Sequence, residues 1–329
     1  CHCIQQKPVL KKAGFFDLNG KVSCQKNLRA VQCGKSGCFL PPRYVGEPQG
    51  LKRQKVQENM KKIGFIGCGN MGQAMALAAA KTMNPSDILL TNRTRAKAEA
   101  FAAAHGMTVC ADNKEAVSRA EMIMLCVKPQ MMQGVLEEIR ETLKACLARG
   151  ERRVLVTVAA MLNTAFYYET LGVSPDELPV VRTMPNTPVS IGKGIVLCSV
   201  ADDRYLPEIE TLKEIFAAAG RFETIPESQM NAAGTLSGCT PAFAYLFIEA
   251  LSDGGVMAGI PRKQAIELAA AAVQGAAAMV LETCKHPGQL KDEVCSPAGT
   301  TIEGVKALEE AGFRNAAFTA VIKAVERGK

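Results

Sequence analysis

Three glycines that follow a short apolar segment have the spacing of a phosphate-binding turn. The segment Ile63–Ile66 is followed by Gly67, Gly69 and Gly72 in the pattern Gly-x-Gly-x-x-Gly, and an alanine-rich stretch comes next. In such a turn the first glycine permits a tight bend, the second lets the backbone approach a pyrophosphate, and the third lets a helix pack closely on its strand. Free N–H groups at the start of that helix face the phosphates. The pattern predicts a dinucleotide site, and the alternative is an ordinary glycine turn.

The segment Thr91–Arg95 should meet the cofactor ribose, because it ends the next predicted strand about twenty residues after the turn. An NAD site usually carries an acidic side chain there, whereas this segment reads Thr-Asn-Arg-Thr-Arg. The two guanidiniums offer charge-assisted hydrogen bonds to a 2′-phosphate. We therefore predict NADPH as the cofactor, with NADH as the weaker choice. The alternative is that the arginines only begin the solvated face of a helix over Arg95–Ala104, which we expect for Arg95 more than for Arg93.

Two further loops, Cys126–Pro129 and Met184–Pro188, are predicted to leave the sheet at its ligand edge and to border the nicotinamide. A proline in each fixes the backbone, and Lys128 or Asn186 can offer a hydrogen bond to the ribose or the carboxamide. The alternative for each loop is a rigid turn with a solvent-facing polar residue. The predicted cofactor-binding residues are Gly67, Gly69, Asn70, Met71, Gly72, Asn92, Arg93, Thr94, Val127, Lys128, Pro129 and Asn186.

A third loop, Ser296–Thr301, leads into a helix predicted over Ile302–Ala311. Successive backbone N–H groups at a helix start form an anion site that suits a carboxylate. The hydroxyls of Thr300 and Thr301 can either cap that helix or bond a substrate nitrogen, and the sequence leaves both alternatives open.

Histidine contributes little to the predicted chemistry. After Met60 the chain has His105, which precedes Gly106 at a predicted helix end, and His286, which lies in a Pro-Gly turn. We expect a structural role for the first and a loop-stabilising role for the second. A reductase of carbonyls needs a proton donor, whereas a cyclic imine that arrives as an iminium is already activated for hydride transfer.

The charge distribution makes nucleic acid an unlikely class of partner. The formal charge is +7, but residues 1–60 hold 11 Lys and Arg against 3 Asp and Glu, and the rest holds 28 against 29. The body of the protein therefore has no basic excess to attract a phosphate backbone.

The cysteines are typical of a reducing compartment. Eight are scattered singly after Met60, and none of these lies in a pair spaced like metal ligands, so we expect free thiols, no metal site and a cytoplasmic protein. We expect no membrane partner, because the most apolar stretch, Ile260–Leu281, is interrupted by charged residues and reaches no span length.

Residues 1–59 are rich in Gln, Lys, Gly and Pro, and they start without a methionine, whereas Met60 is followed at once by the first predicted strand. We expect Met60 to be the natural start and residues 1–59 to be a disordered or non-native leader. The alternative is a small metal-binding appendage built on its cysteines.

Strand candidates alternate with helical stretches from Met60 onward. Because they are apolar on both faces, they predict an α/β fold with a Rossmann-type doubly wound parallel sheet over residues 60–225. From about Ser228 the strand signals end, which predicts an all-helical domain over residues 226–329, broken near residues 260, 287 and 298. The predicted strands are Ile63–Ile66, Ile88–Thr91, Met107–Cys110, Met122–Val127, Val154–Val158, Val180–Arg182, Ile195–Val200 and Arg221–Ile225.

Together these motifs resemble pyrroline-5-carboxylate reductase over residues 60–329. The most specific segments are the carboxyl-terminal ones, and the resemblance rests on His286–Asp292, Ser296–Ile302, Leu308–Glu309, Gly312–Arg314, Asp253–Val256 and Gly259–Arg262.

The resemblance implies a helical dimerisation domain that interlocks with a second subunit, in a homodimer that often joins a ring of dimers. It also implies reduction of 1-pyrroline-5-carboxylate to L-proline, the last step of proline biosynthesis, by hydride transfer from NADPH to the imine carbon. The hydroxyl of Thr301 would contact the ring nitrogen as the catalytic group. The implied substrate-binding residues are Ser296, Ala298, Gly299, Thr300 and Thr301.

The chain departs from the family pattern at Met161, at Cys239-Thr240 and at Ala298, where the family has small residues or glycine. If Ala298 takes a positive φ, it carries a strain of about 1 kcal/mol that glycine avoids. Two alternatives follow. One is an NADP-dependent dehydrogenase of small hydroxy acids, which would need a lysine that Gly234–Val256 lacks, and the other is a non-catalytic NADP-binding sensor.

Overall fold

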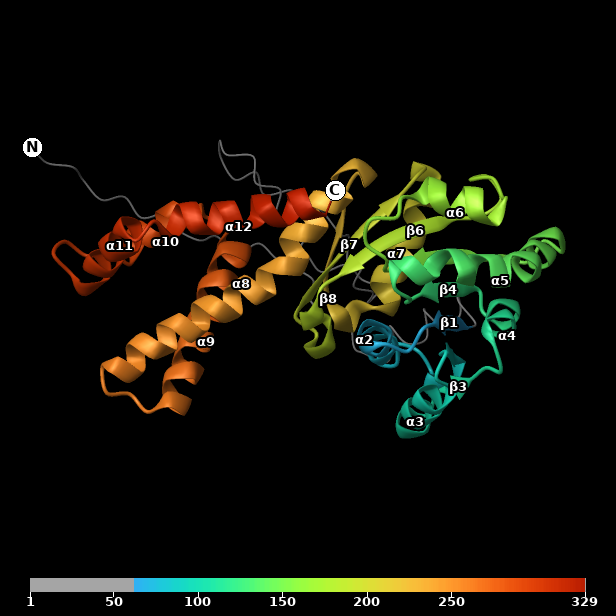
Figure 1. Cartoon of the computed structure of the whole chain (residues 1–329), viewed down its shortest axis with the longest axis horizontal. Coiled ribbons are helices and arrows are strands. Elements are labelled where there is room, and N and C mark those ends of the chain that lie inside the picture. The colour runs from blue at the N-terminus through green and yellow to red at the C-terminus, as the bar shows by residue number, and fades with distance from the viewer. Residues whose placement is uncertain (1–61, 329) are drawn as a thin grey trace, which may run out of the picture. The chain divides into compact units, whose positions relative to one another are not determined.

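The structure is a computed structural model, and it describes residues 62–328; the predicted leader, residues 1–59, lies outside them. The first part is an eight-stranded sheet with the order β3-β2-β1-β4-β5-β6-β7-β8 (Figure 1). All the predicted strand regions form strands, so the α/β fold is confirmed. The strands are β1 (Ile63–Ile66), β2 (Ile88–Thr91), β3 (Thr108–Val109), β4 (Met122–Leu125), β5 (Val154–Thr157), β6 (Val180–Pro185), β7 (Gly194–Val200) and β8 (Gly220–Thr224).

Helices cover both faces of the sheet, as the apolar strands predict. Met122 and Met124 of β4 join one core cluster, whereas Ile123 and Leu125 join the other, because successive side chains of a strand point to opposite faces. The helices packed on the first face are α2 (Asn70–Ala79), α3 (Arg95–His105) and α7 (Leu206–Ile215), and those on the second are α4 (Asn113–Arg119), α5 (Pro129–Ala148) and α6 (Thr164–Leu171).

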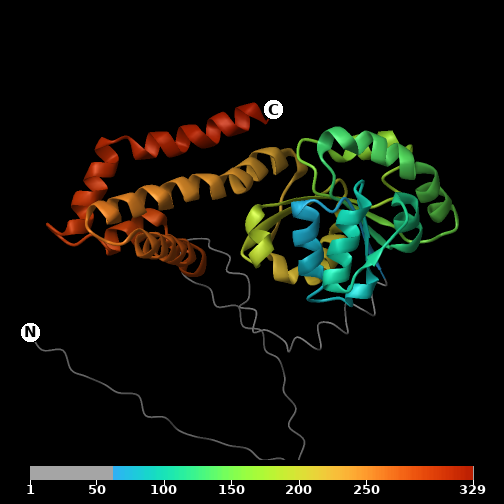
Figure 2. The ribbon, with the colours of Figure 1, turned by 60° about the horizontal axis from the view of Figure 1, so that its bottom comes forward.

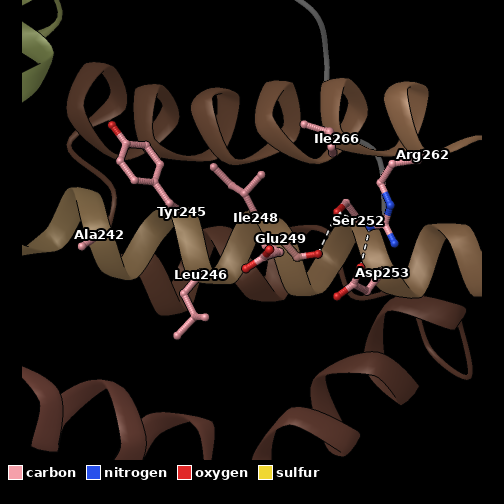
Figure 3. A pocket seen from close by; sticks show the side chains of 9 residues that line it. All are labelled: Ala242, Tyr245, Leu246, Ile248, Glu249, Ser252, Asp253, Arg262 and Ile266. Carbon is pink, nitrogen blue, oxygen red and sulfur yellow. Dashed lines mark hydrogen bonds and ion pairs between the residues drawn. The ribbon is translucent and has the colours of Figure 1, made fainter.

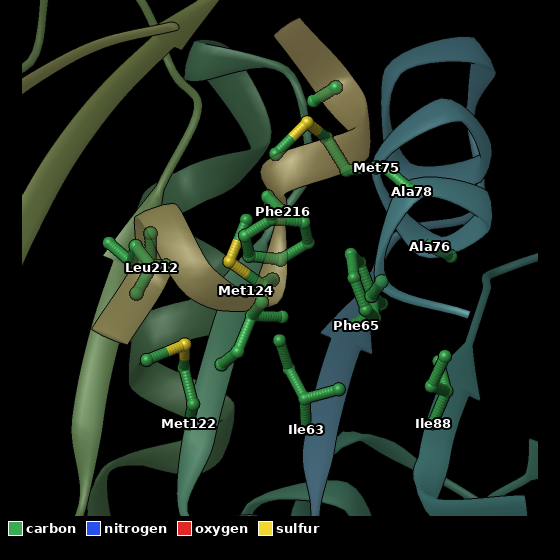
Figure 4. Close-up of a cluster of buried hydrophobic side chains, with 14 of the residues drawn as sticks. Ile63, Phe65, Met75, Ala76, Ala78, Ile88, Met122, Met124, Leu212 and Phe216 are labelled. Atoms are coloured by element: carbon green, nitrogen blue, oxygen red, sulfur yellow. The ribbon is translucent and has the colours of Figure 1, made fainter. Parts of the chain in front are cut away.

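The first core cluster fixes the position of the glycine turn. Phe65 of β1 meets Phe216 edge to face, with ring centroids 6.3 Å apart, and Met75 of α2 packs in the same cluster (Figure 4). These three side chains are almost completely buried. Burial of large apolar side chains on both sides of the turn holds β1 and α2 together, so the backbone between them has little freedom.

The predicted parallel sheet is confirmed for β1 to β6, and the last two strands extend it in the opposite direction. Strands β1 to β6 are parallel, but β7 runs antiparallel to β6, and β8 follows the direction of β7. The β6–β7 connection holds only the short 3-10 helix η2 (Thr187–Ile191), and a parallel pairing needs a crossover of a dozen or more residues. Met184 and Pro185 were predicted to lie in a loop, but they belong to β6, because both pair with residues of β7.

From Met230 onward the described chain is helical, as predicted, and the breaks fall where they were expected. The proposed domain boundary after residue 225 precedes the 3-10 helix η5 (Glu227–Gln229). Helix α12 packs along α8, and Figure 2 shows the two side by side. The helices are α8 (Met230–Met257), α9 (Arg262–Thr283), α10 (Pro287–Glu293), α11 (Thr300–Glu310) and α12 (Phe313–Arg327).

The expectation that no segment reaches the length of a membrane span is wrong for α9. Its 22 residues are long and apolar enough to cross a membrane by length and composition alone, with a mean hydropathy of 1.4 in the most apolar window. Arg262 and Lys263 stand at the helix start, so they interrupt the apolar stretch less than expected. One such helix is only weak support for a membrane span. Exposed apolar side chains are not special to α9, because α8 and α12 also expose large ones, including Leu246 and Phe318.

Candidate active site

Two of the three turn glycines are required by the protein itself. Gly67 has φ +104°, and a Cβ there would lie 2.6 Å from the carbonyl oxygen of Cys126. A Cβ at Gly72 would overlap the carbonyl of Gly67, so the predicted roles in turning and in close helix packing fit the structure. Gly69 differs, because a Cβ added there would meet nothing within 4 Å and its φ of −78° is open to any residue. Packing within the protein does not explain a glycine at residue 69, whereas a ligand that lies close to the backbone there would.

Asn92 holds the turn beside the next loop. Its Oδ1 accepts a hydrogen bond from the N–H of Cys68 at 3.1 Å, and its Nδ2 donates to the carbonyl of Thr94 at 2.9 Å. The N–H of Gly67 donates to the carbonyl of Thr91 at 3.0 Å. The residues predicted to bind pyrophosphate and ribose therefore form one bonded unit across the ends of β1 and β2.

A cavity of about 670 Å³ opens at this unit. It is lined by six of the predicted cofactor residues, which are Gly67, Gly69, Asn92, Arg93, Val127 and Lys128. Five others, Asn70, Met71, Gly72, Thr94 and Pro129, adjoin these along the chain without lining the cavity. The volume suits a cofactor pocket.

Arg93 is a cation of this cavity that has no partner among residues 62–328. Its side chain is exposed, and it has no hydrogen bond or ion pair among residues 62–328, whereas Arg95 pairs with Glu99 at 2.7 Å. This difference agrees with the expectation that Arg95, more than Arg93, begins the solvated face of the helix. A guanidinium with unused donors fits a 2′-phosphate.

The sequence interpretation missed four acidic or amide residues that line the same cavity, namely Asp112, Asn113, Gln130 and Glu138. The hydroxyl of Thr91 donates to Oδ1 of Asn113 at 2.6 Å, and Nδ2 of Asn113 donates to Glu138 at 2.8 Å. The four residues come from the start of α4 and from α5, and only the fold brings these two helices together. The one signal available was that Asp112 closely follows the carboxyl end of a predicted strand.

The two thiols near the turn are suited to stay neutral. Burial is the main cause that raises the pKa of Cys126 to about 12, and burial also raises the pKa of Cys68. Thiols that stay protonated add no negative charge beside the glycine turn.

Asn186 lies outside the cavity that the other predicted cofactor residues surround. Its Nδ2 donates to the carbonyl of Ser237 on α8 at 3.1 Å, and its Oδ1 accepts from the N–H of Ile195 at 2.9 Å. Both ends of the amide are therefore engaged within the protein. Its side chain joins the end of β6 to β7 and to α8.

The predicted substrate loop ends at a helix start without a side-chain cap. Gly299 is the N-cap of α11, which begins at Thr300, two residues earlier than predicted. Neither threonine hydroxyl caps the helix, so the capping alternative is not what the structure shows. The hydroxyl of Thr301 makes no hydrogen bond within the described part of the chain. Ala298 has φ 55°, the positive value that its departure from glycine put in question.

No residue of the loop Ser296–Thr301 lines the 670 Å³ cavity. Helix α8 is anchored at its start to β6 and β7, and its 28 residues span about 42 Å before α9, α10 and the loop follow. One chain therefore does not bring its predicted cofactor and substrate residues into one cavity.

Both histidines have the structural roles predicted for them. His286 is the N-cap of α10, and its Nδ1 accepts the N–H of Gly288 at 3.1 Å. The ring of His105 packs on Phe101 at the end of α3, with centroids 4.7 Å apart.

A second cavity, of about 680 Å³, lies between α8 and α9 (Figure 3). Two segments of the family resemblance, Asp253–Val256 and Gly259–Arg262, meet beside it. Arg262 donates to Oγ of Ser252 at 3.1 Å and pairs with Asp253 at 2.5 Å. These bonds close the corner between the two helices. Tyr245 and Leu246 lie along the same cavity with 62% and 68% of their surface exposed, which leaves apolar area for a partner to cover.

The first part of the chain has the fold of a nucleotide-dependent oxidoreductase, since the carboxyl ends of its strands border a cavity that is lined by a glycine turn and by Arg93. A family model described as NADP oxidoreductase, coenzyme F420-dependent, matches residues 62–148. This places the chain in the class of NADP-dependent oxidoreductases. The model described as pyrroline-5-carboxylate reductase dimerisation matches residues 227–329.

Curated relatives extend this similarity along the described chain. Pyrroline-5-carboxylate reductase of Corynebacterium melassecola is 37% identical over 273 residues, which cover 82% of this chain and 98% of the relative. The enzyme of the same name from Escherichia coli is 38% identical over 82% of this chain and 97% of the relative. The chain belongs to the pyrroline-5-carboxylate reductase family.

Solved structures agree with this assignment. A pyrroline-5-carboxylate reductase from Coxiella burnetii superposes with a TM-score of 0.73 at 30% identity, over 82% of this chain and 98% of the other. The pyrroline carboxylate reductase of Plasmodium falciparum, solved with NADP bound, superposes with a TM-score of 0.69 at 29% identity, over 83% and 98% of the two chains.

Proposed function

We propose that the protein reduces 1-pyrroline-5-carboxylate to L-proline with NADPH, the last step of proline biosynthesis. The observation that carries the proposal is the start of α11. Its first N–H groups follow Gly299 without a side-chain cap, and the hydroxyl of Thr301 makes no bond within residues 62–328. The N–H donors suit a carboxylate, and the hydroxyl oxygen can accept a hydrogen bond from a protonated ring nitrogen held beside it.

Residues at the glycine turn would hold the cofactor. The N–H groups at the start of α2 bind the pyrophosphate, Gly69 leaves room for it, and Arg93 binds the 2′-phosphate. NADPH, when bound, supplies the hydride. The NADP bound in the Plasmodium falciparum relative supports this use of the cavity.

Residues of the loop Ser296–Thr301 would hold the substrate. Their backbone N–H groups bind its carboxylate and so orient the ring. The hydroxyl of Thr301 hydrogen-bonds the ring nitrogen, which enters as an iminium and needs no proton from the protein. Hydride addition to the imine carbon turns the C=N bond into a C–N bond and leaves the nitrogen as the amine of proline.

The proposal includes a homodimer in which the loop of one subunit lies near the cofactor of the other, and a ring built from such dimers. The match to a dimerisation family and the exposed apolar residues of α8, α9 and α12 support a dimer. We propose a cytoplasmic location, which the singly spaced cysteines support.

NADPH oxidation by the full chain with pyrroline-5-carboxylate, beside NADH and a panel of small keto acids, tests the proposal. We expect turnover with the imine alone, faster with NADPH, and proline as the product. Tight NADPH binding without turnover would indicate the sensor alternative. Activity on a keto acid would indicate the hydroxy-acid dehydrogenase, although α8 offers no lysine for that chemistry.

A further inference from the structure

One face of β6 is fastened to the first turns of α8 by three successive contacts. Arg182, Met184 and Asn186 alternate along β6 and its end, so their side chains share a face. Their partners on α8 are Asn231, Gly234 and Ser237, which are three residues apart and so also share a face. We refer to these six residues as the β6–α8 seam.

The first contact of the seam is an ion pair of a buried arginine. Arg182 is 3% exposed, pairs with Glu227 at 3.0 Å and donates to Oδ1 of Asn231 at 3.4 Å. Glu227 accepts two further hydrogen bonds, both at 2.8 Å, from the N–H and the hydroxyl of Thr164 at the start of α6. One carboxylate therefore joins β6 and α6 just before α8 begins. A buried charge with these partners is costly to release.

The second contact is the closest. A Cβ added at Gly234 would overlap the sulfur of Met184, so the backbone of α8 lies directly against this side chain. Gly238 and Gly254, on the same helix, have no neighbour within 4 Å of such a Cβ. A larger residue at position 234 would therefore displace the side chain of Met184, whereas a larger residue at the other two positions would displace nothing.

The seam leads to the reacting end of the proposed site without touching the cofactor cavity. Its residues on β6 lead into the loop predicted to border the nicotinamide, and none of the six lines the 670 Å³ cavity. Helix α8 carries the chain on toward the predicted substrate loop. A shift at the seam would therefore change the distance between hydride donor and imine more than it changes the affinity for NADPH.

We propose that the β6–α8 seam positions the loop after β6 for hydride transfer, with Met184 and Gly234 as the pair of positioning residues. The role rests on the reductase activity proposed above. Asn186 acts in the seam through its bond to Ser237, and this gives its amide a use other than direct contact with the cofactor.

The test is a double-mutant cycle in the full chain. Gly234→Ala should lower kcat with the imine roughly ten- to a hundredfold at saturating NADPH, with little change in the Kd of NADPH. Met184→Ala added to it should restore most of the loss, because it removes the overlapping sulfur. Gly254→Ala is the matched control, since it makes the same change in the same helix without a clash, and it should keep the kcat of the wild type. A wild-type kcat in Gly234→Ala, or a double variant no faster than the single one, would overturn the proposal.

Hydrogen exchange measures the seam independently of turnover. Backbone amides of residues 186–193 should exchange faster in Gly234→Ala and return toward the wild-type rate in the double variant. Unchanged exchange in Gly234→Ala would refute the positioning role of the seam, whatever the activity. A wild-type chain that is inactive on the imine would refute the proposed function, and the exchange rates alone would then test the seam. If Gly234→Ala does not fold, Glu227→Gln serves instead. Exchange and kcat equal to wild type in that variant would also overturn the proposal.

Discussion

The backbone N–H of Cys68 donates to Oδ1 of Asn92 at 3.1 Å and thereby ties the glycine turn to the loop that carries Arg93. The bond spans two parallel strands, β1 and β2, whose carboxyl ends lie side by side. The backbone of the loop that carries the arginine is therefore held close to the turn that would bind a pyrophosphate. Preorganisation of this kind gives affinity by reducing the ordering cost of binding.

Arg93→Ala should weaken NADPH binding roughly ten- to a hundredfold, because it removes charge-assisted hydrogen bonds worth about 1.5–3 kcal/mol. NADH lacks the 2′-phosphate, so its Kd should change little. Arg95→Ala is the matched control, since Arg95 is already paired with Glu99, and it should leave both affinities nearly unchanged. Fluorescence titration of both cofactors measures the difference. Equal losses for NADPH and NADH in Arg93→Ala would contradict the 2′-phosphate role.

Gly69→Ala should separate cofactor binding from stability. The residue has an extended backbone and an added Cβ would meet nothing within 4 Å, so the unfolding free energy should change by no more than about 1 kcal/mol. The Kd of NADPH should rise at least about tenfold, because the new Cβ enters the space that a pyrophosphate needs. Gly67→Ala, with its positive φ and a contact at 2.6 Å, should instead destabilise the fold. Unaltered NADPH binding in Gly69→Ala would show that the pyrophosphate lies elsewhere.

The sequence was sufficient for features that depend on local pattern. Apolar runs predicted the strands, and the glycine spacing predicted a turn whose backbone the structure reproduces at Gly67 and Gly72. The reversal of β7 was missed, because it follows from where β6 ends, and apolar patterning does not fix a strand's last residue. Contacts between distant segments, such as Glu138 with Asn113, have no local signature and required the fold.

Three residues other than glycine adopt a positive φ, which are Met161 at 70°, Cys284 at 55° and Ala298 at 55°, among residues 62–328. Replacing each by glycine should raise the unfolding free energy by about 1 kcal/mol, because an L side chain is strained in this conformation. Ala311→Gly is the matched control, since Ala311 has φ −76° at the end of α11 and glycine should not stabilise there. Denaturant unfolding compares the variants. A loss of stability in all three would mean that contacts of the side chains outweigh the strain.

Thr301→Ala should lower kcat with pyrroline-5-carboxylate roughly ten- to a hundredfold, because a hydrogen bond to a charged group is worth about 1.5–3 kcal/mol. Its hydroxyl has no partner in the described part of the chain and caps nothing, so the loss cannot come from a broken cap. The unfolding free energy and the Kd of NADPH should both stay close to wild type. Thr301→Ser keeps the hydroxyl and should retain most of the rate, since the methyl group has no role in the proposed contact. If Thr301→Ala turns over as fast as the wild type, the hydroxyl does not act on the imine, and orientation by the backbone N–H groups of the loop would have to account for the substrate's alignment.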